Sequence, residues 1–426
     1  MKESGIDWIG QIPEEWEVIK FKYLGDVKQG LTYSPSDIVD KDEGILVLRS
    51  GNIQNGVLDF TNNVYVKTKV AESIVLRKND ILITARNGSS ALIGKNAIID
   101  TDIKATFGAF MMVFRTNKSL IAKFAFYLMN ISFNFYRTFF TTSTVNQLTA
   151  TIFNGIEVPL PSISEQQKIA DFLDKKTAQL DKVKSLLEEQ IQKLKDYRAS
   201  LIYETVTKGL DKTVPLKDSG IDWIGEVPQG WGVKAIKYIF DEIGSGSTPK
   251  SDNEIFYDGD INWIQSGDLY QTDTVMSVSK TISYQGFKST SALKIYQPPF
   301  VALAMYGASV GNVAVSYIDA CVNQAVVVML GTSEKVRFGK YAIEASKNNL
   351  VFSAQGGTQP NISQNLIKNW SIPQPKNEEQ EQIVDFLDKK TVQIEKLIQI
   401  KNQQIENVNK QRQTLIYDYV TGKSRV

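Results

Sequence analysis

The sequence predicts an α+β protein with two tandem β-rich domains, each followed by a long helix, and the two helices pair as an antiparallel coiled coil. Three observations predict this class: an internal duplication, short β-rich runs in each half, and a heptad pattern at the end of each half. At 426 residues, the chain is long enough for each half to bury its own core. We place the β-rich domains at 1–161 and 211–375, the first helix at 162–210, and the second helix with a C-terminal tail at 376–426.

The opening of the chain returns once. Residues 3–13, ESGIDWIGQIP, match residues 218–228, DSGIDWIGEVP, at an offset of 215 residues. Far downstream, IADFLDKKT at 169–177 matches IVDFLDKKT at 383–391, at an offset of 214 residues. Because nearly the same offset separates motifs at both ends of the unit, the whole chain is a duplication.

Short apolar runs bounded by Gly, Asn, Asp and Ser occur in both halves, such as DILIT at 80–84 and AVVVM at 325–329. They predict strands of twisted sheets with long loops and one or two helices in each domain. The most apolar stretch, 120–140, is interrupted by Lys123 and Arg137. We therefore expect a buried helix there and no membrane partner.

A heptad pattern follows each Pro-x-Pro, at 159–161 and 373–375, where proline closes the domain before a helix. Apolar side chains recur every seven residues in the first copy, at Leu173, Leu180, Leu187, Leu194 and Leu201, with Ile169, Val183 and Tyr197 on interleaved positions. The second, weaker copy has Leu387, Ile394, Val408 and Leu415, with Leu397 interleaved. Polar residues at interleaved positions of both copies, Lys176, Lys390, Gln190 and Gln404, either fix register or are solvated edges of a broad helix face.

Composition excludes several kinds of chemistry. The chain has no histidine, which removes histidine-dependent catalysis and histidine metal ligation. A single cysteine, Cys321, excludes an internal disulfide and a cysteine zinc cluster and fits a reducing cytoplasm. With 48 basic and 47 acidic residues, the net charge is +1, so any nucleic-acid binding needs local basic patches or partner subunits.

The repeated GIDWIG opening, the Pro-x-Pro before each DFLDKKT helix start and the duplication together resemble the specificity subunit of type I restriction-modification enzymes. The resemblance covers the chain from end to end. It implies two target-recognition domains that each read half of a split site in double-stranded DNA, and spacer helices that dock two methyltransferase subunits. It also implies a non-catalytic subunit without a cofactor or metal of its own. S-adenosylmethionine, ATP and Mg would belong to adenine methyltransferase and restriction/translocase partner subunits.

The spacer and the divergence between the halves shape the expected DNA site. A helix of about 43 residues would span about 65 Å. This length is enough to position two DNA-binding domains on half-sites that lie about 34 Å apart. The likeness between the halves lies in the openings and the helices, and the difference lies in the β-rich loops. We therefore expect a bipartite and asymmetric site.

Base readout needs Arg, Asn, Gln, Ser or Thr on loops that enter the major groove. In the first domain we expect DNA contacts from Arg49, Ser50, Asn52, Arg86, Asn87, Asn146 and Gln147, with Lys95 and Lys104 on phosphates. In the second domain we expect them from Gln265, Ser266, Asp268, Tyr306, Ser309, Asn323, Gln324, Thr358, Gln359 and Asn361, with Lys250 and Lys294 on phosphates. For each residue the alternative is a role in its own turn or plain solvation.

Other functions find weaker support. QPPF at 297–300 nearly matches the Asn/Asp-Pro-Pro-Tyr/Phe box of amino-methyltransferases, but glutamine is one methylene too long. Asp80 with Asp102 and Lys104 resembles a nuclease metal site, yet the second half lacks it, so we expect solvated charges at strand ends. The alternative function is a non-catalytic coiled-coil scaffold or adaptor whose β-rich domains bind protein or glycan, which the near-neutral charge favours.

Overall fold

The computed structural model describes residues 1–137, 146–354 and 361–426. It divides into two compact units, Met1–Leu187 with Asn402–Val426 and Glu188–Lys401. Each unit therefore contains one β-rich domain together with part of each long helix. The α+β class with two β-rich domains is confirmed.

Two four-stranded sheets make up most of the first β-rich domain. One has the order β11-β10-β13-β4, and its central strands are β10 (Ile81–Thr84) and β13 (Met111–Thr116). The other has the order β12-β6-β9-β5, in which β12 (Ala105–Phe107) runs parallel to β6 (Ile45–Leu48). Every residue of β10 is buried, which confirms the strand predicted from its apolar run.

The remaining strands of this domain are short. They are β1 (Lys2–Glu3), β2 (Gln11–Ile12), β3 (Glu17–Lys20), β4 (Gly25–Gln29), β5 (Ile38–Val39), β7 (Ile53–Gln54), β8 (Val57–Leu58), β9 (Val64–Val66), β11 (Asn96–Ile98) and β14 (Glu157–Leu160). The helices are α1 (Ala122–Tyr136) and α2 (Ala150–Gly155). α1 is largely buried, as predicted for this apolar stretch, and within the described ranges no helix is both long and apolar enough to cross a membrane.

The core of the first unit is aromatic at its centre. The Phe21 ring stacks on Phe153 with centroids 4.8 Å apart, and Phe114 approaches both rings at 5.4 and 5.0 Å. The buried faces of α1 and β10 belong to the same apolar cluster. These contacts give the loops at the strand ends a rigid support.

The second β-rich domain is built from a five-stranded and a three-stranded sheet. The larger has the order β18-β25-β22-β23-β20, with β22 (Phe300–Ala304) and β25 (Val326–Leu330) buried in its middle, and α5 (Ser333–Ser353) packs on it. In the smaller, β24 (Cys321–Val322) runs parallel to β19 (Tyr257–Ile264). The strand predicted from the AVVVM run is therefore confirmed as β25.

The other elements of this domain complete the same plan. They are β15 (Leu216–Asp218), β16 (Glu226–Pro228), β17 (Gly232–Ala235), β18 (Glu242–Ser245), β20 (Thr274–Val275), β21 (Thr281–Ile282), β23 (Val313–Ser316), β26 (Ser371–Gln374), α4 (Tyr284–Lys288) and α6 (Gln364–Asn369).

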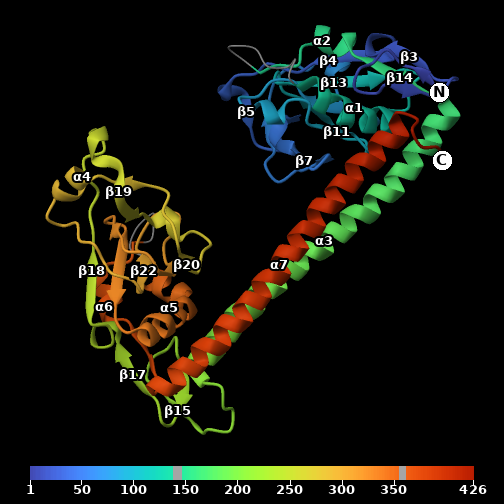
Figure 1. Cartoon of the computed structure of the whole chain (residues 1–426). Helices are drawn as coiled ribbons and strands as arrows, with labels where there is room; N and C mark the ends of the chain where they lie inside the picture. Colours follow the sequence, from blue (N-terminus) through green and yellow to red (C-terminus); the bar gives the residue numbers. More distant parts are fainter. Residues whose placement is uncertain (138–145, 355–360) are drawn as a thin grey trace. The chain divides into compact units, whose positions relative to one another are not determined.

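The long helices are α3 (Ile163–Lys208) and α7 (Asn377–Val420), of 46 and 44 residues. In the first unit the start of α3 lies beside the end of α7 (Figure 1), where the rings of Phe172 and Tyr419 are 4.4 Å apart. Asp181 lies further along α3, and its Oδ1 is 3.2 Å from Nε of Arg412, which lies earlier in α7. Because numbering rises along one helix as it falls along the other, the pairing is antiparallel.

The second unit pairs the other parts of the same helices. There the Nζ of Lys401 donates to Oε1 of Gln190 at 2.6 Å. The antiparallel pairing predicted from the heptads is confirmed. Of the seam residues predicted at seven-residue intervals, Leu173, Leu387 and Ile394 are buried, and Leu180, Leu187, Leu194, Leu201, Val408 and Leu415 are half-buried.

Ile169 is buried, but further along the helices the interleaved seam positions were predicted one residue too early. Leu397 is 46% exposed whereas Ile398 is 6% exposed, so Leu397 is not a seam residue of this helix pair. On α3, Val183 and Tyr197 are likewise exposed, whereas Ile191 is half-buried. A heptad alternates steps of three and four residues, and the structure places the longer step after each leucine. The exposure of Lys176 and Gln404 fits solvated edges of the helix face, and Lys390 is half-buried. Gln190 is exposed but accepts the hydrogen bond from Lys401 of the other helix.

Candidate nucleic-acid interface

In the first unit, backbone hydrogen bonds join the ends of several strands. Gly108 N donates to Leu48 O at 3.0 Å, Ala85 N to Phe110 O at 2.9 Å, and Leu148 N to Ala85 O at 2.8 Å. These bonds join the segments that follow β6, β10 and β12 to the segment that precedes α2. Four loops far apart in the sequence therefore form one surface. Those loops carry most of the residues predicted to read DNA in this domain.

The second unit repeats this frame bond for bond. Asn323 N donates to Ile264 O at 3.0 Å, Met305 N to Ala325 O at 2.8 Å, and Ile362 N to Met305 O at 2.8 Å. The frame thus defines equivalent positions in the two units. Arg49 corresponds to Gln265, Arg86 to Tyr306, Phe110 to Ala325, and Gln147 to Asn361. The backbone is shared while the chemistry of the presented side chains differs.

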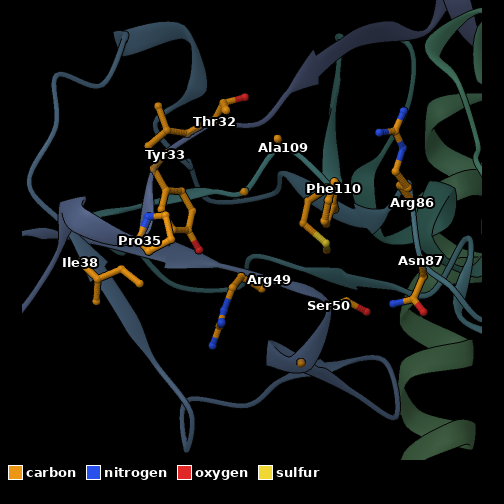
Figure 2. A pocket seen from close by; sticks show the side chains of 14 residues that line it. Thr32, Tyr33, Pro35, Ile38, Arg49, Ser50, Arg86, Asn87, Ala109 and Phe110 are labelled. Carbon is orange, nitrogen blue, oxygen red and sulfur yellow. The ribbon is translucent and has the colours of Figure 1, made fainter.

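A hollow of about 700 Å³ lies on this surface in the first unit (Figure 2). Arg49 and Ser50 line it from the end of β6, and Arg86 and Asn87 line it from the end of β10. Phe110, from the turn after β12, also lines it and is 61% exposed. Four predicted DNA-contacting residues therefore share one hollow.

The cations around the hollow are held by neutral groups. Nη2 of Arg86 donates to Oε1 of Gln147 at 2.7 Å, and Nη2 of Arg49 donates to the Asn62 carbonyl at 3.2 Å. Nζ of Lys95 donates to the Ser50 carbonyl at 3.4 Å. Within residues 1–137 and the other described ranges, none of the three forms an ion pair. Their positive charge is available to an anionic ligand.

The pKa of Lys95 is lowered by partial burial. An anion placed beside the ammonium group would compensate for that loss of hydration. Lys95 therefore suits a phosphate contact more than an isolated surface lysine would.

Other predicted residues of the first domain shape the loops. Asn52 is 1% exposed, accepts from Arg49 N at 2.9 Å and donates to the Asp59 carbonyl at 2.9 Å. Asn146 donates to the Gly88 carbonyl at 3.1 Å, and Asn87 accepts from Ser89 N at 3.0 Å. These contacts match the alternative reading in which such residues serve their own turns.

Lys104 lies apart from this surface. It precedes β12, whereas the hollow lies after that strand. The structure therefore does not bring Lys104 together with Arg49 and Arg86.

In the second unit, Gln324 forms hydrogen bonds with Thr248 and Tyr306. Its Oε1 accepts from Oγ1 of Thr248 at 2.5 Å. The pKa of Tyr306 is raised, because the effect of burial outweighs the opposing effect of a hydrogen bond with Gln324. Gln265, Ser266 and Asn361 retain exposed surface at the same strand ends. Lys250 is exposed as well.

Several predicted residues of the second domain have internal partners. Asp268 accepts from Gln265 N at 2.8 Å and from Ser279 N at 3.0 Å, and Asn323 accepts from Ala325 N at 3.0 Å. Lys294 pairs with Glu242 at 2.6 Å, and Ser309 is 5% exposed. Thr358 and Gln359 lie outside the described residues.

The sequence did not indicate Phe110 or Tyr33, which also lines the hollow. A phenylalanine beside a strand is normally expected in the core. Only the fold, which turns the chain outward at Gly108, reveals that Phe110 is presented to solvent. No pattern in the sequence distinguishes it from the buried phenylalanine at 107.

The expectation of solvated strand-end charges was wrong for Asp80. Its carboxylate is 1% exposed and accepts from Nε and Nη2 of Arg115 at 2.8 and 2.7 Å. The pKa of Arg115 is raised by these hydrogen bonds. Asp80 is therefore occupied in a buried ion pair, and among the described residues no group of three or more acidic or cysteine side chains could hold a metal ion.

A duplicated β-rich frame that presents two different sets of polar side chains, with a part of the paired long helices in each unit, defines a two-domain recognition protein. The family model described as type I restriction modification DNA specificity domain matches residues 13–195 and 228–410. The chain belongs to this family.

Named relatives agree with that assignment. The StySPI specificity subunit of Salmonella potsdam is 30% identical over 219 residues, which cover 50% of this chain and 47% of that protein. The EcoKI specificity subunit of Escherichia coli is 31% identical over 198 residues, covering 45% of this chain and 43% of that protein. These two matches thus span about half of each relative. The putative MjaX specificity subunit of Methanocaldococcus jannaschii is 26% identical over 98% of this chain and 96% of its own length.

Two solved structures share the fold. A chain from work on complex assembly and conformational transition of the type I R-M system has a TM-score of 0.73 at 17% identity, covering 97% of this chain and all of that chain (100%). The HsdS subunit from Thermoanaerobacter tengcongensis has a TM-score of 0.51 at 16% identity, covering 97% of this chain and 98% of that one.

Proposed function

We propose that this chain is the DNA-binding specificity subunit of a type I restriction-modification complex and that it reads a bipartite, asymmetric site in double-stranded DNA. The observation that carries the proposal is the repeated frame with different side chains at equivalent positions. Arg49 and Arg86 in one unit are replaced by Gln265 and Tyr306 in the other. Two equivalent frames that present different side chains would read two different half-sites.

The chemistry of each surface suits base edges. Arginine can donate two hydrogen bonds to guanine, and glutamine or asparagine can pair with adenine in the major groove. The surface of the first unit offers Arg49 and Arg86, which have no carboxylate partner among the described residues, and the surface of the second offers mainly amides and a phenol. Because the net charge is near zero, the proposal assigns the required phosphate contacts to local cations such as Lys95 and to partner subunits.

In this proposal the chain works in the cytoplasm and directs partner enzymes without catalysing a reaction itself. Two adenine methyltransferase subunits would dock on the long helices, and restriction/translocase subunits would complete the complex. The partners would bring S-adenosylmethionine, ATP and Mg. Exposed apolar side chains on the helices of the second unit support docking there, since Tyr197 is 55% exposed and Leu397 and Ile400 are 46% and 47% exposed.

A domain exchange tests the modular reading. Residues 1–161 would be replaced with the corresponding domain of another family member, and methylated adenines would be sequenced in a host that expresses the chimera with its methyltransferase. We expect one half of the methylated sequence to change and the other half to stay. A change in both halves, or in neither, would contradict the proposal.

A scaffold that binds protein or glycan is the competing function, and the near-neutral charge is the observation that favours it. Electrophoretic shift with specific and random duplexes, with and without the co-purified methyltransferase, separates the two. Preference for one duplex sequence in the complex supports the specificity subunit. No dependence on DNA in either state supports the scaffold.

A further inference from the structure

The floor of the hollow in the first unit is largely apolar. We propose that it receives the C5 methyl group of a thymine in the major groove, so that the half-site read by this unit contains a thymine recognised through that methyl. The inference rests on the proposed function and adds to it the kind of base contact that one domain makes.

The geometry provides an apolar receptacle between cations. Tyr33, Pro35 and Ile38 line the hollow on one side, and the exposed ring of Phe110 lines it on the other. Figure 2 places Phe110 between Arg49 and Arg86. A group entering the hollow would therefore contact apolar carbon at the centre and positive charge at the edges.

Base pairs offer few groups that suit such a floor. In the major groove they present hydrogen-bond donors and acceptors, and the one apolar group is the thymine methyl. A donor or acceptor pressed against Phe110 would lose its water without a replacement partner. Removing a methyl group of this size from water favours binding about three- to tenfold.

The charges around the hollow favour DNA over an apolar small molecule or a protein side chain. Arg86 is fixed by Gln147 at 2.7 Å, with its guanidinium carbon 5.8 Å from the Phe110 ring centroid. Nζ of Lys95 donates a hydrogen bond to the carbonyl of Ser50, 3.4 Å away. Cations on either side of an apolar patch match phosphates and base acceptors that flank a thymine methyl.

Among its described residues, the second unit has different side chains at the equivalent positions, and it serves as an internal comparison. Ala325 takes the position of Phe110, and Tyr306 takes that of Arg86. Gln324 adds an amide with a hydrogen bond to Thr248. Thymine methyl groups in the second half-site should therefore contribute less to binding than the methyl in the first.

The test uses the full chain in complex with its methyltransferase. Affinity would be measured for the specific duplex and for duplexes in which each thymine, on either strand, is replaced by deoxyuridine, which lacks only the methyl. We expect a three- to tenfold loss at a position in the first half-site and less than twofold at every position in the second. In Phe110→Ala the loss on removing that methyl should fall below twofold.

A matched variant is Tyr23→Ala, because Tyr23 is an aromatic residue of the same unit, is 60% exposed, and does not line the hollow. It should keep the full response to deoxyuridine. The inference is overturned, with the proposed function intact, if DNA binding is sequence-specific but no thymine methyl in the first half-site matters. It is also overturned if Phe110→Ala responds like the wild type, or if that half-site lacks thymine. Absence of any sequence-specific binding would overturn the proposed function as well.

Discussion

The indole Nε1 of Trp16 donates a hydrogen bond to Oε2 of Glu165, 3.0 Å away in the first turn of α3. Trp231 makes the same contact with Glu379 in the first turn of α7, at 2.8 Å. A carboxylate in this position also faces the positive end of the helix dipole. The repeated tryptophan and glutamate thus fix the start of each long helix against the β-rich domain that precedes it.

Replacing Trp16 with phenylalanine would keep most of the buried ring and remove the donor. We expect the free energy of unfolding of the first unit to fall by about 1–2 kcal/mol, because a hydrogen bond to a half-buried carboxylate is lost. Urea denaturation followed by circular dichroism measures the change. Trp231→Phe should produce a similar loss in the second unit, and unchanged stability in both variants would show that the contact is not stabilising.

The sequence predicted the helix pair well but not its full seam. Leucines at seven-residue spacing define one seam position with certainty, and Leu173 and Leu387 are buried as expected. The second position can lie three or four residues further on. Leu397 lies three residues after Ile394 and Ile398 lies four residues after it. Because both side chains are apolar, hydrophobicity alone could not show which of the two is the seam residue. Packing against the partner helix decided it.

The recognition surface was predicted at the level of loops more than of side chains. Arg49, Ser50, Arg86 and Asn87 come together in one hollow, since each pair lies in the loop that follows a strand, β6 or β10. The sequence could not show that the Asn52 amide is consumed within its own turn, because that depends on the Asp59 carbonyl across the loop. DNA contact by each of these residues stays a prediction.

The second unit contains a cluster of four charges with little exposure at its centre. Lys340 on α5 is 4% exposed, and its Nζ lies 2.8 Å from Asp273 and 2.7 Å from Glu344. Arg198 on α3 also contacts both carboxylates. Burial disfavours the charge on Asp273, but Lys340 and Arg198 outweigh it and lower the pKa of that carboxyl. The cluster connects the end of α3 to the second domain.

Lys340→Met should lower the free energy of unfolding of this unit by about 2–4 kcal/mol, because it leaves a partly buried carboxylate with one cation fewer. Lys335→Met is the matched control on the same helix. Its ion pair with Asp241 is more exposed, so removing it should cost less than about 1 kcal/mol. Chemical denaturation of both variants measures the difference, and equal losses would contradict a special role for the cluster.

The same cluster should make stability depend on pH. The folded pKa of Asp273 is lowered, so its contribution is fully present above the ordinary aspartate pKa of about 4 and is lost as pH falls through the folded value. The stability difference between wild type and Lys340→Met should thus be constant above about pH 5 and shrink below about pH 4. A difference that grew on acidification would contradict this sign.

Cys321 should be unreactive in the folded protein. It is fully buried in β24, and burial first, with Asp319 second, raises the pKa of its thiol to about 12. The reactive thiolate is therefore scarce at neutral pH. Titration with a thiol reagent at pH 8 should show no fast reaction in the native state and full reaction in urea. Rapid labelling without denaturant would contradict the burial of this strand.

The neighbouring residues Leu397 and Ile398 allow the seam and the outer face of α7 to be tested separately. Ile398→Ala removes a side chain that is 6% exposed, so it should lower the free energy of unfolding by about 2–4 kcal/mol through the cavity it leaves. Leu397→Ala alters a side chain that is 46% exposed and should cost less than about 1 kcal/mol. If methyltransferase subunits dock on this face, Leu397→Ala should weaken their binding in a pull-down titration while the isolated chain stays equally stable. Ile398→Ala should show the larger loss of stability. A larger loss in Leu397→Ala would instead support the register first predicted from the sequence, in which Leu397 is the seam residue.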